Sequence, residues 1–179
     1  MPTSISEPGS PSTSAAGGLL PGLPDSARLW AFGVSRPLDP GEEQSFLKAV
    51  DAFLATWKAH GDPLAATREW VEGRLLLVGV DERVAAPSGC SIDALVRILQ
   101  GFESELGVEI VGGGAIWHRE PAGGDPVRSS RSDFREMARQ GKVGSDTIVF
   151  DLAITRVGEL REGKWERPAA GSWHRRYLS

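Results

Sequence analysis

The sequence predicts an α+β protein, and three observations support this prediction. Two segments with apolar residues at helical spacing lie among short apolar segments with strand character. Between residues 28 and 118 the order is strand, helix, strand, strand, helix, strand. Glycine and proline residues mark the ends of these segments, as they do in turns and at helix termini. We therefore expect an antiparallel sheet that carries two helices on one face.

The first 24 residues predict a disordered arm. Sixteen of them are Pro, Ser, Gly or Thr, and they show no periodic apolar pattern. Such a segment buries too little apolar surface to offset the entropy lost on ordering. The folded chain should begin near residues 23–27, followed by a first strand over residues 28–34 that places Trp30, Phe32 and Val34 on one face.

The first helix is predicted to run from residue 40 to His60. Asp39 is suited to cap it, Pro40 to occupy its first position, and Glu42 to complete a capping box. A stripe of apolar residues at three- and four-residue steps defines its buried face: Phe46, Val50, Phe53, Leu54 and Trp57. Two strands should follow, joined by a tight turn at Glu72-Gly73.

The second helix should begin just after Cys90, with Ser91 as N-cap, and should end at Gly107. Residues 108–118 are apolar but interrupted by three glycines, which favours a weak or bent edge strand. The complete order is that of a ferredoxin-like split βαβ sandwich, and we assign residues 25–120 to such a body.

Residues 121–179 are predicted to form a C-terminal α/β extension that packs on the body. A linker rich in Gly, Pro, Ser and Arg leads to a short helix over residues 133–140, and residues 147–157 have strand character. The tail over residues 165–177 has no clean period and is expected to wrap over the body.

Composition narrows the class of protein. The chain has 179 residues, of which 40% are hydrophobic, and no apolar run approaches the roughly 18 residues that span a bilayer. We expect no membrane insertion. A single cysteine forms no internal disulfide, and the N-terminus lacks a basic region followed by an apolar segment. Both observations favour the cytoplasm.

The formal net charge of −4 argues against a general nucleic-acid binder, which usually presents a strongly basic face. The charges are unevenly distributed: residues 1–116 hold 8 basic and 15 acidic residues, whereas residues 117–179 hold 12 and 9. Two explanations stay open. Both parts could simply have solvated surfaces, or the basic part could dock on the acidic body or on an acidic partner.

The candidate catalytic pair is Cys90 with His60. Cys90 is expected just outside a helix N-terminus, where free amides and the helix dipole favour a thiolate. Antiparallel packing of the two helices would bring the end of the first, with His60, toward the start of the second. The alternative is a small buried cysteine and a histidine that caps a helix.

The same helix start is a candidate ligand site. Ser88, Gly89 and Ser91 could hold a small anionic ligand by exposed amides, with Asp93 in the first helical turn. Arg83 is the candidate to complete the pocket, with Arg74 or His60 as further cations. Ordinary helix capping is the alternative. A protein partner at this position is also open.

Other chemistries find little support. The segment Gly89-Cys90-Ser91-Ile92-Asp93 is one residue short of the G-x-S-x-G motif of serine hydrolases. Histidine and cysteine residues do not occur in pairs at metal-ligand spacing, so we expect no metal, and the glycines at 112–114 lack the pattern of a dinucleotide site, so we expect no cofactor.

Several segments together resemble a known family: residues 23–30 (LPDSARLW), 57–64 (WKAHGDPL), 80–82 (VDE), 88–93 (SGCSID), 146–150 (DTIVF) and 172–174 (SWH). The chain resembles, over roughly residues 23–178, a small family of uncharacterised bacterial proteins often labelled "ABC transporter ATPase". The resemblance implies a bacterial relative and no particular mechanism. The label itself does not fit, because Gly141-Lys142 and Gly163-Lys164 are not followed by the Ser or Thr of a P-loop.

The sequence thus favours a cytoplasmic binding or regulatory module with a small-ligand or anion site at Gly89–Asp93. A thiol-dependent enzyme that uses Cys90 with His60 is the alternative.

Overall fold

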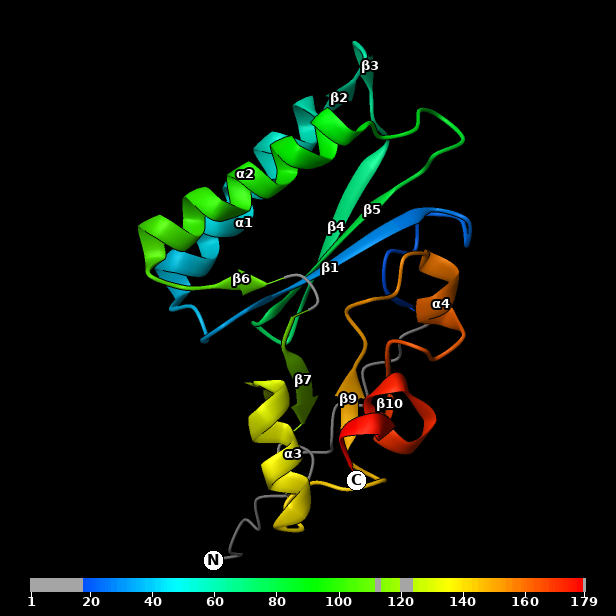
Figure 1. Cartoon of the computed structure of the whole chain (residues 1–179). Coiled ribbons are helices and arrows are strands. Elements are labelled where there is room, and N and C mark those ends of the chain that lie inside the picture. The colour runs from blue at the N-terminus through cyan, green and yellow to red at the C-terminus, as the bar shows by residue number, and fades with distance from the viewer. Residues whose placement is uncertain (1–17, 112–113, 120–123, 179) are drawn as a thin grey trace, which may run out of the picture.

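The computed structural model describes residues 18–111, 114–119 and 124–178, and it shows a mixed α and β protein with antiparallel sheets (Figure 1). Four α-helices lie in this part of the chain: α1 (Pro40–Thr56), α2 (Gly89–Leu106), α3 (Arg131–Arg139) and α4 (Val157–Arg161). Two short 3₁₀ helices follow near its end: η2 (Ala169–Gly171) and η3 (Trp173–Tyr177). Among the described residues, none of the helices combines the length and apolar character that a bilayer crossing requires.

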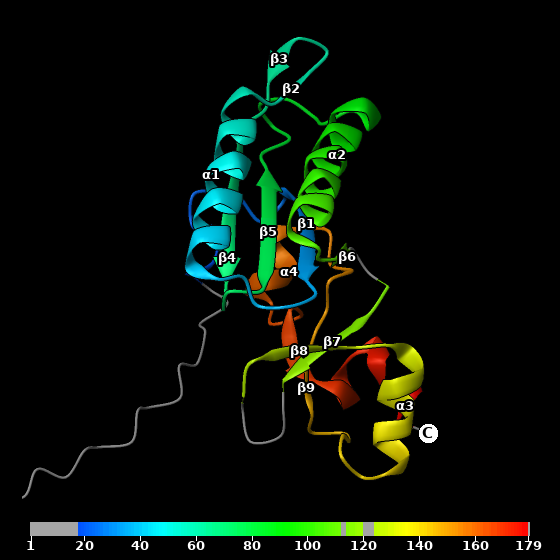
Figure 2. The same cartoon turned by 90° about the vertical axis from the view of Figure 1, so that its left-hand side faces the viewer.

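The first sheet has the strand order β4-β5-β1-β6, and its paired strands are antiparallel. Its strands are β1 (Arg28–Val34), β4 (Ala66–Val71), β5 (Leu75–Val80) and β6 (Ile110–Val111). Helices α1 and α2 cover one face of it (Figure 2). The predicted turn between β4 and β5 is confirmed, with φ of 51° at Glu72 and 66° at Gly73.

Side chains of β5 alternate between two cores, because successive residues of a strand point to opposite faces. Leu76 and Val78 pack with the helices α1 and α2, whereas Leu75 and Leu77 belong to a cluster on the other face. This second face is covered by β7, by the region around α4 and by the start of the described chain. The central strand is therefore apolar on both faces because both faces are covered.

The packed chain starts earlier than the sequence suggested. Leu20 is 1% exposed and Leu23 is 9% exposed, and both belong to the cluster on the second face of the first sheet. Residues 18–24, which were assigned to the disordered arm, are thus part of the folded structure. The rest of that arm, residues 1–17, lies outside the described residues.

The first helix begins as predicted but ends sooner. The Asp39 side chain accepts hydrogen bonds from the helix start, and Glu42 completes the capping box. The helix ends at Thr56 rather than His60, because the chain turns into a small hairpin of β2 (Lys58–Ala59) and β3 (Asp62–Pro63). His60 and Gly61 form its turn, with φ of 51° and 93°, and the proline that follows Asp62 disfavours helix at that position.

The strand predicted over residues 108–118 is instead two strands in two sheets. β6 pairs with β1, whereas β7 (Ile116–Arg119) pairs with β8 (Pro126–Ser129) and β9 (Ile148–Phe150). The second sheet has the order β10-β9-β7-β8. Residues 112–113, two of the three glycines between these strands, lie outside the described residues.

The C-terminal part builds most of the second sheet. The predicted short helix is confirmed as α3, which starts two residues earlier than expected. The tail does not wrap over the body as an irregular segment, since β10 (Glu166–Pro168) pairs with β9. Residues 153–157 were expected to be a strand, but only an isolated bridge between Arg28 and Arg156 forms there before α4 begins.

Arginines of the C-terminal part form ion pairs with the part of the chain that precedes it. Arg119 pairs with Glu72 at 2.5 Å and Arg128 pairs with Glu109 at 2.5 Å. Two further pairs of the same kind join Arg156 to Glu82 and Arg161 to Asp25. In each of these pairs the cation comes from residues 117–178 and the carboxylate from the preceding part of the chain. The uneven charge distribution therefore includes intramolecular docking.

Candidate functional site

The start of α2 lies at one end of the first sheet, beside the end of α1 and the β2–β3 hairpin (Figure 1). A buried hydrogen bond fixes this arrangement: the Trp57 Nε1–H donates to the Ser91 carbonyl at 2.9 Å. At the opposite ends of the two helices, the Arg36 guanidinium donates to the Leu106 carbonyl at 2.8 Å. The helices therefore run antiparallel, as the sequence predicted, and we call the region of residues 57–63 and 81–93 the tip.

The N-cap of α2 is Ser88, and the assignment of Ser91 as N-cap was wrong. The Ser91 amide donates to Ser88 Oγ at 3.2 Å, and the Ser88 amide donates to Ser91 Oγ at 2.8 Å. The Ser91 hydroxyl also donates to the Ser88 carbonyl at 2.8 Å. The two serines are three residues apart, so they form a reciprocal capping box. The Ser91 amide and hydroxyl are thus already used within the protein.

Cys90 is the second residue of α2 rather than a residue outside it, and it is exposed. Within the described part of the chain, the Gly89 and Cys90 amides donate no hydrogen bond. They are among the first amides of an 18-residue helix, where the dipole favours a negative group. Asp93 is exposed and lies beyond the first turn, which contains no acidic residue.

His60 is exposed in the hairpin turn and not at a helix C-terminus, because α1 ends before it. No hydrogen bond joins the His60 ring to the Cys90 thiol in the described structure. Their cooperation stays a prediction.

The two arginines proposed for the pocket differ in position. Arg83 lies at the tip, where its Nη2 and Nε hold the two oxygens of Asp81 at 2.7 and 2.9 Å. This ion pair keeps the pKa of the Asp81 carboxyl below its usual value. Arg74 lies at the opposite end of β5, directly before its first residue. Its guanidinium is buried and donates to the carbonyls of Val34, Ser35 and Pro126. Arg74 is therefore structural and does not belong to the tip.

Two glycine–lysine pairs can also be placed. Gly141 and Gly163 have φ of 69° and 72°, and each follows the end of a helix. A P-loop instead precedes a helix, so that the first amides of that helix surround the phosphates. Within the residues that the structure describes, no group of three or more His, Cys, Asp or Glu side chains could hold a metal ion.

A hollow of about 540 Å³ lies at the other end of the molecule, in the C-terminal segment that contains η2 and η3. It is lined by Ala170, Gly171, Ser172, Trp173, Arg175 and Arg176. The adjacent arginines beside a tryptophan were the visible signal in the sequence. Their arrangement depends on the fold, since Trp173 is held by Asp151, which follows β9.

Comparisons with protein-family models, with curated proteins and with solved structures give no match.

The hydrogen bond that orders the tip can be tested by replacing Trp57 with phenylalanine. The change leaves the buried Ser91 carbonyl without its donor, which we expect to lower the free energy of unfolding by about 2 kcal/mol, measured by urea denaturation. Trp70→Phe is the matched control, because the Trp70 Nε1–H is buried without a partner in the described structure. An equal loss in both variants would show that the hydrogen bond does not order the tip.

Proposed function

We propose that this protein is a binding or regulatory module that holds a small anionic ligand at the tip, against the Gly89 and Cys90 amides. The observation that supports it most directly is the pair of exposed amides, without internal partners, at the start of an 18-residue helix. A capping serine frames them, and the Trp57 hydrogen bond fixes the helix start. Such an arrangement offers donors that need no reorganisation before an anion binds.

The tip carries charges of both signs, and its acidic residues are Asp62, Asp81, Glu82 and Asp93. Lys58 and His60 are exposed on the hairpin, and Arg83 is exposed on the adjacent loop. Asp81 offsets one of these charges through its ion pair with Arg83. Among the predicted ligand residues, Gly89 supplies one of the free amides and Ser88 precedes it as the N-cap. Ser91 contributes through the cap, whereas Asp93 opposes an anion by its own charge.

The proposal can be tested by titrating inorganic phosphate into the ¹⁵N-labelled protein and following individual amides by NMR. Gly89→Pro removes one donor yet suits the first helical position, because Ser88 has extended φ and ψ of −93° and 164°. We expect this variant to bind phosphate at the tip about tenfold more weakly.

Gly89→Ala keeps the amide and is the matched control, since an added Cβ meets no atom within 4 Å. It should bind phosphate at the tip like the unchanged protein. Amides of Gly89 and Cys90 that do not respond to phosphate in the unchanged protein would contradict the proposal.

A thiol-dependent enzyme that uses Cys90 with His60 is the second candidate. It is favoured by the exposure of Cys90 within the first turn of α2, where the thiol is accessible to a substrate. Under this hypothesis, iodoacetamide should modify Cys90 at pH 7 faster than it modifies an unstructured cysteine peptide, and His60→Gln should slow the reaction. Equal rates for protein and peptide would reject the thiol mechanism. If the protein is instead a binding module, Cys90→Ser should leave phosphate binding at the tip unchanged.

The finer description of the fold is part of the same proposal. We infer that residues 28–111 form a ferredoxin-like split βαβ sandwich, supported by the strand order β4-β5-β1-β6 and the antiparallel helices on one face. Because a fold of this kind supports many functions, the argument for function rests on the tip. A cytoplasmic location, favoured by the single free cysteine, and membership of the bacterial family that the chain resembles complete the proposal.

A further inference from the structure

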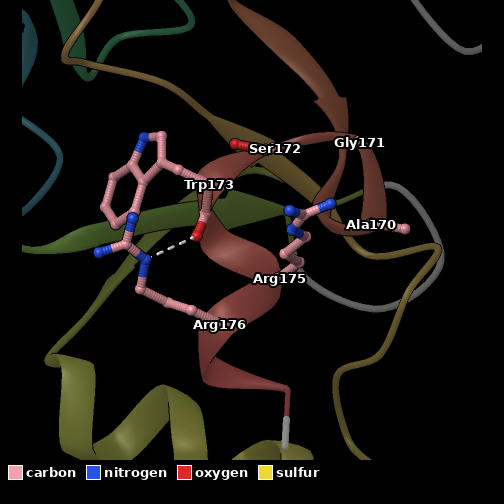
Figure 3. A pocket seen from close by; sticks show the side chains of 6 residues that line it. All are labelled: Ala170, Gly171, Ser172, Trp173, Arg175 and Arg176. Carbon is pink, nitrogen blue, oxygen red and sulfur yellow. Dashed lines mark hydrogen bonds between the residues drawn. The ribbon is translucent and has the colours of Figure 1, made fainter.

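The hollow near the C-terminus is formed by the consecutive segment that contains η2 and η3 (Figure 3). Its volume of about 540 Å³ lies within the range of sites for small molecules. The side chains of Trp173 and Arg176 lie along one part of it, and Arg175 extends on the other side beside Gly171 and Ala170 (Figure 3). It therefore combines two cations, one aromatic ring and a small apolar surface.

The two cations of the hollow have no counter-charge within it. Neither Arg175 nor Arg176 forms an ion pair with a residue in the described part of the chain, and no carboxylate lines the hollow. The nearby Asp151 is 6% exposed, and its oxygens face the Trp173 Nε1–H at 2.9 Å and the Arg167 guanidinium at 3.9 Å. Two arginines that line one hollow without carboxylate partners favour a ligand with two negative charges.

Two of the side chains around the hollow, those of Trp173 and Arg176, are held in place before any ligand binds. Arg176 Nε–H donates to the Trp173 carbonyl at 3.1 Å, and its guanidinium lies 5.6 Å from the centre of the Trp173 ring (Figure 3). Trp173 also donates a hydrogen bond to Asp151, stacks on the His174 ring at 3.8 Å and contacts the Tyr177 ring edge-on. Such order lowers the entropic cost of binding.

Buried polar groups fix the base of this segment. Ser172 is 4% exposed and His174 is 1% exposed, and Ser172 Oγ lies 2.7 Å from His174 Nδ1. Burial lowers the pKa of the His174 imidazole to about 4, so the ring is neutral near pH 7. The positive charge of the hollow therefore comes from the two arginines.

We propose that this hollow binds a small organic phosphate monoester, whose phosphate lies between Arg175 and Arg176 and whose organic part lies against Trp173 and Ala170. A phosphate monoester carries close to two negative charges at pH 7, which matches the two guanidinium groups. The volume leaves room for an organic group beyond the phosphate. This site is separate from the tip and does not depend on the function proposed there.

Phenyl phosphate is the probe, with binding followed by isothermal titration calorimetry on the full chain. We expect Arg175→Gln and Arg176→Gln each to weaken its binding about tenfold or more, because each removes a charged donor. Arg131→Gln is the control, since Arg131 is also exposed but lies outside the hollow. Gly89→Pro, which alters the tip, should leave this affinity unchanged.

Two further ligands separate the parts of the proposal. Inorganic phosphate should bind at this site more weakly than phenyl phosphate, because it lacks the ring. Benzoate should also bind more weakly, because it carries one negative charge. If either bound as tightly as phenyl phosphate, the assignment to an organic phosphate monoester would be wrong.

Other outcomes would overturn the site itself. One is the absence of saturable phenyl phosphate binding, and another is unchanged affinity in the double glutamine variant of Arg175 and Arg176. A third is a complex with single-stranded RNA that depends on these arginines and is tighter than the complex with phenyl phosphate. Both arginines are exposed, so their glutamine variants should unfold at the same temperature as the unchanged protein. Weaker binding then reports on the hollow and not on the fold.

Discussion

Replacing Gly33 by alanine is expected to destabilise the protein by about 3 kcal/mol, although alanine usually suits a β-strand better than glycine. A Cβ atom added at Gly33 would lie 2.2 Å from Cζ2 and 2.3 Å from Cε2 of Trp117. Trp117 is 1% exposed, and the Arg74 guanidinium lies 5.0 Å from the centre of its ring. The indole cannot move away without disturbing the contact between the two sheets, so the clash strains the core.

Urea denaturation of Gly33→Ala and Gly101→Ala tests this expectation. Gly101 is an exposed position within α2 where an added Cβ meets no atom within 4 Å, so the same substitution should stabilise the protein by about 0.5–1 kcal/mol. In a Trp117→Leu background, the cost of Gly33→Ala should fall because the obstacle is gone. A cost that is independent of residue 117 would show that the ring does not occupy this space.

The contact between Gly33 and Trp117 differs from the features of the fold that could be predicted from the sequence. Three features were predictable because each depends only on residues that are close together in the sequence. They are the start of α1, the turn at Glu72-Gly73 and the end of α2 at Gly107. Local signals were therefore sufficient for them. Residue 33 must be glycine because the Trp117 ring occupies the space of a Cβ atom there. Trp117 is far away in the sequence, so no local pattern reveals this contact.

At the candidate site the sequence located the tip but misplaced its details. Ser88 and Ser91 are both suitable N-caps, and the reciprocal hydrogen bonds between them place Ser91 at the third position of the helix. Trp57 marks where α1 gives way to the hairpin with His60. The hairpin decides where α1 ends, although the apolar stripe of the helix continues to Trp57.

The sequence indicated where the chain passes from one sheet to the other, but it did not indicate that two sheets form. The glycines at 112–114 correctly indicated an interruption, but the choice of partner strand for β7 depends on pairing with β8 and β9. The hollow at the C-terminus is similar. Its lining residues all lie between Ala170 and Arg176, but the groups that hold Trp173 in place include Asp151, which is 22 residues away in the sequence.

Acidification from pH 6.5 to pH 4 should destabilise the protein through His174, by up to about 3 kcal/mol. Burial lowers the pKa of this imidazole to about 4, with smaller contributions in the same direction from Arg167, Arg176 and His118, whereas Asp151 acts in the opposite direction. An unfolded histidine has a pKa of about 6.5. Between these values the unfolded state binds the proton and the folded state does not, so stability falls as the pH falls.

His174→Gln should remove this part of the pH dependence, because glutamine stays neutral and its amide can still bond Ser172 Oγ. The measurement is the free energy of unfolding in urea at several pH values between 4.5 and 7.5. His60→Gln is the control, since His60 is exposed in the β2–β3 turn and its replacement should leave the slope unchanged. Glu42, whose pKa the Arg36 hydrogen bond lowers to about 2, titrates below this window and does not contribute to the comparison. If stability fell with pH as steeply in His174→Gln as in the unchanged protein, the buried imidazole would not be the source of the pH dependence. Protonation of other groups would then have to explain the loss of stability.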